Sequence, residues 1–416
     1  MAGVGIRFWE MARHLGPRYN VTLAIPNAPE ECPPLTAAKV VRYGESNIAE
    51  LARSADAVIV HGHISNFYFA QGISRPLVVD LYDPFPIENL NYFPELGDEP
   101  YRYDRLTIER QLRHGDLFLC SSAEQRLFYL GMLYTLGRLT PQTYFDDFEL
   151  ANLVREVPFG ISTGEPGPEF PEPTARPAAP VLRGVIDGIG EDDPVILFGG
   201  IYDWYDPMLL VRALPELITR FPALRVVFSA NPNPESTPQA LYAEVRAECE
   251  KRNWLNRHVF FVPWVPPDRR RALYAESTIA VVLHRARFET ELSMRTRILD
   301  FLGAGLPTVA TAGGAVSRML IGNEMGVVVP AGDATEVVVA VTRLLESESL
   351  RRELANRGKL WGAGQTWEAV LRPVVEFLDA PRTDPQKYLY AAGPLAEENA
   401  RAGLAGRLKR KLRRLL

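Results

Sequence analysis

Residues 284–311 contain the densest group of side chains whose types and spacing can do chemistry. Two acids, Glu289 and Glu291, are followed closely by two bases, Arg295 and Arg297. Carboxylates accept hydrogen bonds from sugar hydroxyls, and arginines beside a helix N-terminus hold phosphate oxygens. The segment therefore predicts a site for a hydroxyl-rich, phosphate-bearing ligand. The alternative is a solvated, salt-bridged helix start.

Strand–helix alternation predicts the elements that position this segment. We expect a strand that ends at His284, a helix that begins near Ser293, and a further strand after Pro307. Short, continuous apolar runs are typical of strands covered on both faces, so their alternation with helices predicts doubly wound parallel α/β sheets. Ligands bind outside the carboxyl ends of such strands, which is where the polar loops lie.

The alternation runs through the chain twice. In the first half, strands fit Val21–Ile25, Ala57–Val60, Leu77–Asp80 and Leu117–Cys120, and helices fit Ile6–Leu15, Arg102–Arg113 and Ala123–Leu136. In the second half, strands fit Val195–Gly199, Arg225–Ala230, His258–Val262, Ile279–His284, Thr308–Thr311 and Gly326–Val329. Helices there fit Pro207–Phe221, Pro238–Arg252, Arg269–Glu276, Met294–Gly303, Thr335–Glu346 and Trp367–Leu378.

A proline-rich stretch separates the two halves. Proline fixes φ and removes a donor, which favours an extended linker at 164–181 over a long loop inside one domain. We therefore expect one domain at 1–163 and a second at 182–366. A helix at 367–380 would cross back to the first domain, and a tail at 381–416 would follow.

Composition excludes several protein classes. The 416 residues are 47% apolar and 23% charged, which is typical of a globular protein with two or three domains. No apolar run is long enough to span a membrane, and no secretory leader opens the sequence. Cys32, Cys120 and Cys249 are too far apart for a disulfide framework or a thiolate zinc site. We expect a cytoplasmic protein.

Common catalytic motifs are missing from the sequence. It has no GxSxG, P-loop or HExxH motif, and no GxGxxG that follows a strand with an acid at the right distance. Hydrolases of those types, P-loop enzymes and nicotinamide dehydrogenases are therefore disfavoured.

Polar side chains follow two predicted strands of the first half. The His61-Gly62-His63 turn could hold a metal, contact a substrate or be an ordinary loop, and the absence of a third ligand at helical spacing disfavours a metal. Asp80 ends the next strand, where a catalytic role and turn chemistry are both open.

Residues 284–311 resemble the donor-binding stretch of GT-B glycosyltransferases, especially the retaining enzymes of family four (glycosyltransferase group 1). That family has two glutamates separated by seven residues, followed by A-M-A-x-G-x-P. Asp300 matches the second acid, with the glycine and proline of the motif in register. The first acid is expected at Leu292, and Glu291 lies one residue earlier, so the chain resembles a variant subgroup.

Other stretches extend the resemblance. Val195–Tyr202 is similar to the strand that opens the family's second domain, and it includes Gly199 and Gly200. The arginine and lysine that usually follow are replaced by a stretch around Trp204, which makes Arg295 and Arg297 the better candidates for the diphosphate. Two further segments resemble stretches of the family. His258–Val265 is similar to the stretch that meets the nucleotide base, and Val157–Ile161 is similar to the stretch that closes the first domain.

The start of the chain resembles the family's glycine-rich loop beneath the donor phosphates, with Gly5 as the candidate residue. That loop normally follows a strand. We therefore expect a strand upstream of Met1 in the natural protein.

The resemblance implies a fold, a reaction and residue roles. The fold is GT-B, with two Rossmann-like domains facing across a cleft, and the reaction moves a sugar from a nucleotide-sugar to a glycan, lipid-linked or cell-envelope acceptor with retention. Asp300 would hold the ribose and Glu291 the donor sugar, and Glu289 is a further donor-binding candidate. The catalytic candidates are Asp80, His61 and Glu291, and Gly5, Gly199, Gly200, Trp204 and Val265 would line the donor.

No metal or cofactor is expected, because the nucleotide-sugar would be a substrate. Two alternatives stay open. The altered motif fits a catalytically silent nucleotide-sugar-binding subunit, and the same fold also carries epimerases and phosphorylases.

The C-terminal tail is strongly basic. Its last sixteen residues carry seven Lys and Arg and no acid, although the whole chain has a net charge of −5. Leucines recur there at helical spacing, from Leu404 to Leu416. This pattern favours an amphipathic helix on an anionic membrane surface. A solubilising tail or a helix docked on the acidic body are the alternatives, and the acidic body disfavours nucleic-acid binding.

Overall fold

The computed structural model describes residues 3–161, 179–231, 238–266 and 269–389. Most of the predicted linker and the whole basic helix of the tail lie outside the described residues. Within the described chain, no helix is both long and apolar enough to cross a bilayer.

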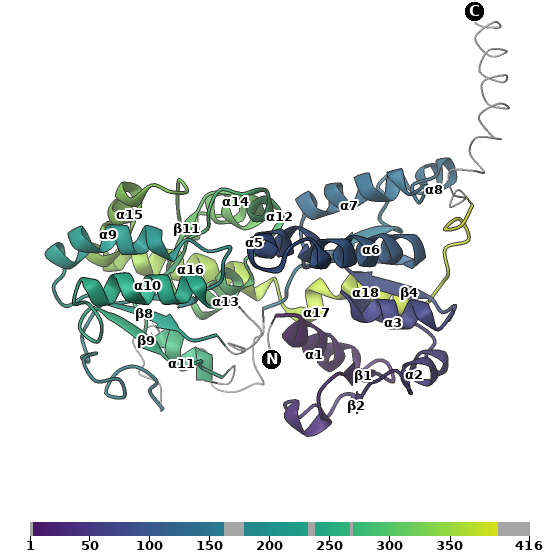
Figure 1. Cartoon of the computed structure of the whole chain (residues 1–416), viewed down its shortest axis with the longest axis horizontal. Coiled ribbons are helices and arrows are strands. Elements are labelled where there is room, and N and C mark those ends of the chain that lie inside the picture. The colour runs from purple at the N-terminus through teal and green to yellow at the C-terminus, as the bar shows by residue number, and fades with distance from the viewer. Residues whose placement is uncertain (1–2, 162–178, 232–237, 267–268, 390–416) are drawn as a thin grey trace, which may run out of the picture. The chain divides into compact units, whose positions relative to one another are not determined.

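The described chain divides into two compact units (Figure 1). One unit is made of the described parts of Met1–Arg42, Asp83–Gly97 and Val157–Arg372. The other is made of the described parts of Tyr43–Tyr82, Asp98–Glu156 and Pro373–Leu416. We call the first the donor-side unit, because it contains residues 284–311, where the sequence predicts donor binding, and the other the second unit. The domain boundaries at 163 and 182 stay a prediction.

The donor-side unit is built on a six-stranded parallel sheet with the order β12-β11-β10-β7-β8-β9. Its strands are β7 (Val195–Gly200), β8 (Arg225–Ser229), β9 (Val259–Val262), β10 (Ile279–Val282), β11 (Thr308–Thr311) and β12 (Val327–Val329). The connecting helices are α9 (Pro207–Arg220), α10 (Ala240–Lys251), α11 (Arg270–Ala275), α12 (Phe288–Leu292), α13 (Thr296–Ala304), α14 (Gly314–Gly322), α15 (Ala334–Glu346), α16 (Glu348–Ala363) and α17 (Trp367–Val370).

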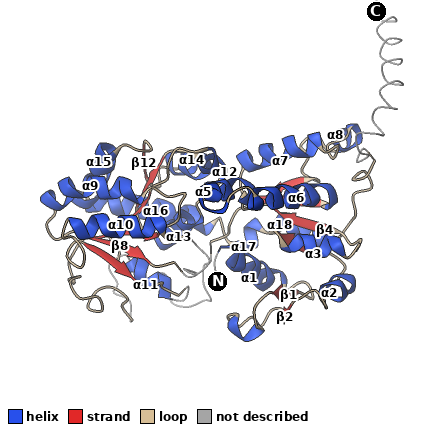
Figure 2. Cartoon of the chain, viewed as in Figure 1, coloured by secondary structure: helices blue, strands red, loops and turns tan. Residues whose placement is uncertain are grey.

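Helices cover this sheet on both faces (Figure 2). They pack in two groups, with α9 against α10 and α15, and α13 against α11 and α16. Every residue of β7, β10 and β11 is buried. Because both faces of these strands are covered by helices, successive side chains on either face are buried, and the strands appear in the sequence as continuous apolar runs.

The donor-side unit also holds α1 (Gly3–Leu15), a two-stranded parallel sheet and a short helical segment. The sheet consists of β1 (Thr22–Ile25) and β2 (Lys39–Arg42), and η1 (Pro29–Glu31) lies between these strands in sequence. The helical segment consists of α4 (Phe85–Glu88), η2 (Asn89–Tyr92) and α5 (Phe93–Leu96). Buried Arg7 ties α1 to the Val157–Ile161 stretch by donating to the carbonyls of Val157 (2.9 Å) and Pro158 (3.1 Å).

The second unit contains a four-stranded parallel sheet with the order β3-β4-β5-β6. Its strands are β3 (Val58–His61), β4 (Leu77–Asp80), β5 (Leu117–Cys120) and β6 (Val154–Glu156). Its helices are α2 (Ile48–Ser54), α3 (Ile64–Ala70), α6 (Glu99–His114), α7 (Ala123–Thr135) and α8 (Pro141–Asp146); α18 (Arg372–Leu378) begins in the donor-side unit and continues into this one. Ser122 caps α7 by accepting from the Gln125 N–H.

Several predicted helices have other bounds in the structure; α1 begins at Gly3 and α6 at Glu99, each three residues before the predicted start. The helix expected from Ser293 begins at Thr296, because Ser293 and Arg295 have non-helical backbone angles, and the loop before it contains α12. The single helix expected over Trp367–Leu378 is two helices, α17 and α18. Pro373 explains the break, since proline cannot donate to the preceding turn and instead occupies the first turn of a new helix.

Candidate functional site

The order of strands in the donor-side unit identifies the edge where a ligand would bind. If its six strands are renumbered 1 to 6 in chain order, from β7 to β12, their order across the sheet is 3-2-1-4-5-6. The direction in which successive strands are added reverses between strand 1 (β7) and strand 4 (β10). Doubly wound sheets bind ligands at this switch point, outside the carboxyl ends of the strands. The loops after β7, β10 and β11 therefore form the candidate site.

Arg297 holds the loop after β7 in place. Its Nη1 donates to the carbonyls of Phe198 (3.0 Å) and Gly200 (3.1 Å), and its guanidinium lies 4.8 Å from the centre of the Tyr205 ring. Gly199 has φ +83°, and a Cβ there would lie 2.9 Å from Arg297 Nη1. The glycine is thus required by both the backbone angle and the approach of the arginine.

Arg295 is a buried cation with open hydrogen-bonding positions. Only 4% of its surface is exposed, and its Nη1 donates to the Thr311 carbonyl oxygen at a distance of 2.6 Å. Nε and Nη2 are buried without a hydrogen-bond partner. Burial lowers the pKa of Arg295 to about 10, and Glu289 opposes that shift. A buried cation with two unused donors is costly unless a ligand completes it.

Glu289 lies beside this cation. It is 3% exposed, and its Oε1 is buried without a hydrogen-bond partner. Burial raises the pKa of Glu289, whereas hydrogen bonds from Ser293 and Thr290 and the charge of Arg295 oppose the rise. The site therefore presents an acceptor next to unfilled donors.

Two glycines close the loop after β11. Gly313 has φ +118° and Gly314 has φ +72°, and a Cβ on Gly314 would lie 2.5 Å from the Thr290 carbonyl oxygen. Glu291 Oε2 accepts from the Gly314 N–H at the start of α14 (3.0 Å) and pairs with Arg318 at 3.5 Å. Sequence reasoning missed these glycines, although adjacent glycines between a strand and a helix are a signal for close backbone approach to a ligand.

The part of the chain that contains these loops matches a known family. Residues 193–347 match the family model described as "Glycosyl transferases group 1". This part of the chain is thus similar to group 1 glycosyl transferases. The search of curated protein sequences finds no match.

Solved structures support the same fold over most of the chain. Sucrose-phosphate synthase from Thermosynechococcus elongatus has 14% identity and a TM-score of 0.62, with 91% of this chain and 93% of that chain covered. Anabaena HepE in complex with UDP-glucose has 14% identity and a TM-score of 0.64, with 91% and 96% covered. The trehalose-6-phosphate synthase OtsA has 16% identity and a TM-score of 0.61, with 82% and 75% covered. The predicted GT-B fold with two Rossmann-like domains is confirmed.

Other predicted donor residues of the donor-side unit lie around the same edge. Half-buried Asp300 is on α13, and burial raises its pKa to about 6, with Arg270 and Arg297 opposing the rise. Trp204 stacks on Tyr202 with ring centres 4.9 Å apart and planes 8° apart. Val265 follows β9 and packs on the core of the domain.

Gly5, the remaining predicted donor residue, is exposed within α1. The structure thus places it in a helix of the donor-side unit, and its role stays a prediction.

The histidines and Asp80 lie at the carboxyl ends of β3 and β4 in the second unit. His61 Nδ1 is 2.8 Å from the Asp80 carbonyl oxygen, and the Asp80 residue is fully buried. His63 Nε2 pairs instead with Asp104 at 2.5 Å. The two histidines thus have different partners, and the described residues contain no group of three potential ligand side chains placed to hold a metal.

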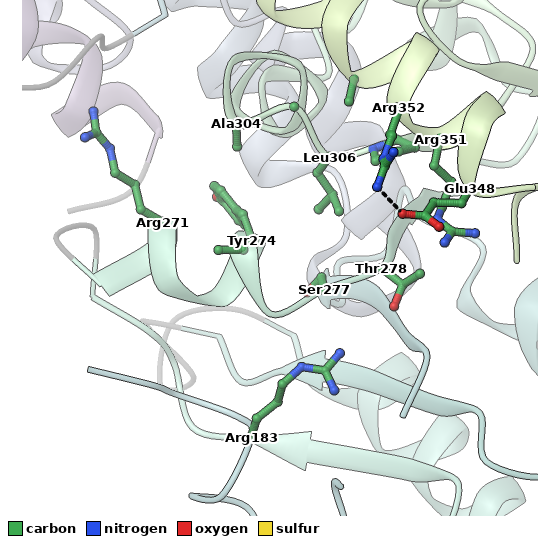
Figure 3. Close-up of a pocket in the computed structure, with 14 residues that line it drawn as sticks. Arg183, Arg271, Tyr274, Ser277, Thr278, Ala304, Leu306, Glu348, Arg351 and Arg352 are labelled. Atoms are coloured by element: carbon green, nitrogen blue, oxygen red, sulfur yellow. Dashed lines mark hydrogen bonds and ion pairs between the residues drawn. The ribbon is translucent and has the colours of Figure 1, made fainter. Parts of the chain in front are cut away.

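A cavity of about 240 Å³ lies elsewhere in the donor-side unit (Figure 3). It includes Thr278 and Pro307, which precede β10 and β11, so it lies at the amino edge of the sheet. Its arginines are already engaged: Arg183 and Arg351 donate to backbone carbonyls, and Arg352 pairs with Glu348 at 2.6 Å. The position and the filled donors separate this cavity from the candidate donor site.

Proposed function

We propose that this protein transfers a sugar from a nucleotide-sugar donor to a glycan, lipid-linked or cell-envelope acceptor, with retention of anomeric configuration. The observation that carries the proposal is Arg295, a buried cation with two unused donors at the switch point of a group 1 glycosyl transferase domain. Charge develops on the departing diphosphate during glycosyl transfer, and a fixed buried cation stabilises such charge best.

The donor residues divide by chemistry. Arg295 contacts the diphosphate, and Asp300 accepts from the ribose hydroxyls. Glu289 and Glu291 contact the donor sugar. Arg297 acts through the β7 loop, because its Nη1 is bonded to carbonyls of that loop.

Gly199, Gly200, Trp204 and Val265 line the nucleotide in this proposal, and Gly5 lies beneath its phosphates. HepE, whose structure contains UDP-glucose, supports a nucleotide-sugar as the ligand class. Neither the base nor the sugar follows from that similarity.

His61 and Asp80 are the further catalytic candidates in this proposal. The transition state is oxocarbenium-like, as in glycoside chemistry generally. The residues of the chain then hold donor and acceptor in line and stabilise the leaving diphosphate. Because Arg295 supplies the positive charge, we expect turnover to persist in EDTA.

Binding and turnover test the proposal separately. A ligand at 100 times its Kd stabilises the folded protein by about 2.7 kcal/mol, so thermal shifts with nucleoside diphosphates and their sugar esters reveal the donor. Release of nucleoside diphosphate in the presence of acceptor then demonstrates transfer. Binding without turnover across acceptor classes would favour a catalytically silent subunit, and no binding to any nucleotide would refute the donor site.

The basic tail places the protein on an anionic membrane surface in this proposal. Each basic group near such a surface contributes about 1 kcal/mol, so the tail can hold the protein there reversibly. Co-sedimentation with anionic and neutral vesicles compares the full chain with one ending at Asn399. Equal binding of both chains, or binding that salt does not weaken, would exclude the tail as the anchor.

A further inference from the structure

Helix α8 and the turn after it expose a cluster of aromatic side chains on the second unit. Tyr144, Phe145 and Phe148, which we call the aromatic patch, are 46%, 70% and 66% exposed. Their rings contact one another, with centres 5.3 to 6.0 Å apart. Helix α7, which precedes α8 in the chain, also exposes Leu127 and Tyr134 (Figure 1). Large apolar side chains that gather on a surface indicate that another surface covers them.

The charge around the aromatic patch is negative. Residues 139–150 contain Asp146, Asp147 and Glu149 and no Lys or Arg. Within the part of the chain that the structure describes, none of these three carboxylates forms an ion pair. A surface of this kind attracts a basic partner and repels an anionic one. The aromatic patch therefore fits a partner that combines an apolar face with basic flanks.

The described chain ends in a segment that is fixed to the residues on either side of this patch. Arg382 Nη2 donates to Asn152 Oδ1 at 2.9 Å, and Asp384 pairs with Arg138 at 2.9 Å. Arg138 precedes α8, and Asn152 follows the aromatic patch, so the two contacts bracket it in sequence. Buried Lys387 forms a further ion pair within the same unit. The C-terminal tail thus leaves the second unit from a point beside the patch.

We propose that residues 401–416 form an amphipathic helix that docks its leucines on the aromatic patch and its basic side chains against the surrounding acids. Leu404, Leu408 and Leu412 repeat at helical spacing, and the segment carries seven Lys and Arg and no acid. The eleven residues 390–400 can span about 40 Å, so the link is long enough for docking. Because the helix belongs to the same chain, its effective concentration at the patch is in the millimolar range.

Docking would regulate the membrane binding of the proposed function. The leucine face that enters an anionic membrane surface is the same face that docks, so one helix cannot do both at once. The aromatic patch thus holds the tail until an anionic surface competes for it. The docking itself does not depend on the transfer reaction, because none of its residues belongs to the donor loops.

Titration with a labelled peptide of residues 401–416 tests the docking directly. The chain ending at Asn399, which we call the shortened chain, retains every described residue and leaves the aromatic patch open. The peptide should bind the shortened chain at least about 10-fold more tightly than the full chain, whose own tail occupies the patch. Added salt should weaken this binding, because the basic and acidic side chains attract each other through solvent.

Two double variants of the shortened chain locate the peptide site. Phe145→Ser with Phe148→Ser should weaken peptide binding at least about 10-fold, because aromatic anchors carry most of the energy of such contacts. Asp146→Asn with Glu149→Gln should weaken it about 5-fold, since each exposed ion pair contributes little. Leu360→Ser is the matched control, because it removes an 80% exposed apolar side chain from the donor-side unit and should leave peptide binding unchanged.

Vesicle binding of the full chain separates the tail from other occupants of the patch. Phe145→Ser with Phe148→Ser frees the tail, so this variant should bind anionic vesicles more tightly than the parent. Weaker vesicle binding would overturn the inference and make the aromatic patch itself the membrane contact. A dimer of the parent that the variant does not form would also overturn it, and would assign the patch to a second copy of the chain.

The peptide titration decides the docking whatever the vesicles show. The inference is wrong if the peptide binds the full and shortened chains equally, or if it binds the Phe145→Ser, Phe148→Ser variant as tightly as the shortened chain. If the full chain and its variants bind no vesicles, the membrane part of the proposed function fails and the docking stands on the peptide. Should a double variant not fold, the comparison of the full and shortened chains decides.

Discussion

Arg295 and Arg297 should respond in opposite ways when each is replaced by methionine, which has a similar length and no charge. We expect Arg295→Met to weaken binding of nucleoside diphosphate and to leave folding stability almost unchanged. We expect Arg297→Met to destabilise the fold strongly. The two arginines are neighbours in sequence, so the contrast tests the structure rather than the composition of the segment.

The magnitudes follow from the partners of each guanidinium. Arg295 has one hydrogen bond, to the Thr311 carbonyl, and two buried nitrogens with no partner. Losing a hydrogen bond from a charged group costs about 1.5–3 kcal/mol, and burying an unpaired donor costs about 1–3 kcal/mol, so removal of the side chain is close to neutral for stability. The loss of its contact to the diphosphate should reduce affinity roughly 10- to 150-fold.

Arg297 has the opposite balance. Its Nη1 is bonded to two carbonyls of β7, and its guanidinium faces the Tyr205 ring. Together these contacts are worth about 3–4 kcal/mol. For a domain of this size, each kcal/mol lowers the Tm by about 2–4 °C, so Arg297→Met should lower it by roughly 10 °C.

Calorimetric melting and titration with the nucleoside diphosphate that binds the parent protein, in one buffer, measure both effects. The reasoning is refuted if Arg295→Met binds the diphosphate as tightly as the parent. It is also refuted if Arg295→Met lowers the Tm as much as Arg297→Met does.

Three further predictions use other residues. Because burial raises the pKa of Asp300 to about 6, donor affinity measured by titration calorimetry should fall as the pH drops through 6, and Asp300→Asn should abolish this dependence. The Asp300 carboxyl ionises near pH 4 in the unfolded chain and near pH 6 in the folded protein. The free energy of unfolding should therefore fall as the pH rises from about 4 to about 6. Gly313→Ala, at φ +118°, should cost about 1–3 kcal/mol of strain and weaken diphosphate binding; unchanged melting and binding would count against the loop geometry. Lys387→Met leaves the buried Asp116 carboxylate, 2.8 Å away, without its charged partner and with only the Asp384 and Leu77 N–H groups as donors, so denaturant unfolding should show a loss of about 3–5 kcal/mol.

The buried strands were predictable from the sequence because burial on both faces produces continuous apolar runs. Leu77–Asp80, Leu117–Cys120 and Thr308–Thr311 have the predicted bounds. The strands that were missed, β2 (Lys39–Arg42) and β6 (Val154–Glu156), are short and include charged residues. Each lies at the edge of its sheet and has no run of apolar residues to reveal it.

The candidate site was only partly predictable, because spacing shows which residues are near one another and not what each one contacts. The sequence places Arg295 and Arg297 together, but only the structure shows that one is bonded to β7 and the other has open donors. Helix α4 packs against α12, which carries Glu289 and lies about two hundred residues further along the chain. No local pattern reports a contact of that kind, since it depends on the fold of the whole unit.

The departure of the β7 loop from the family pattern has a physical explanation in Arg297. The chain resembles enzymes that carry an arginine and a lysine in this loop, whereas here the loop contains Asp203 and Asp206. The Arg297 guanidinium reaches the same loop from α13 and lies where a Cβ on Gly199 would meet it. A further cation in the loop would therefore lie beside an existing one, at an electrostatic cost. Positive charge at this edge of the sheet thus comes from Arg297 of α13 and from Arg295, the N-cap residue before that helix, and not from the β7 loop.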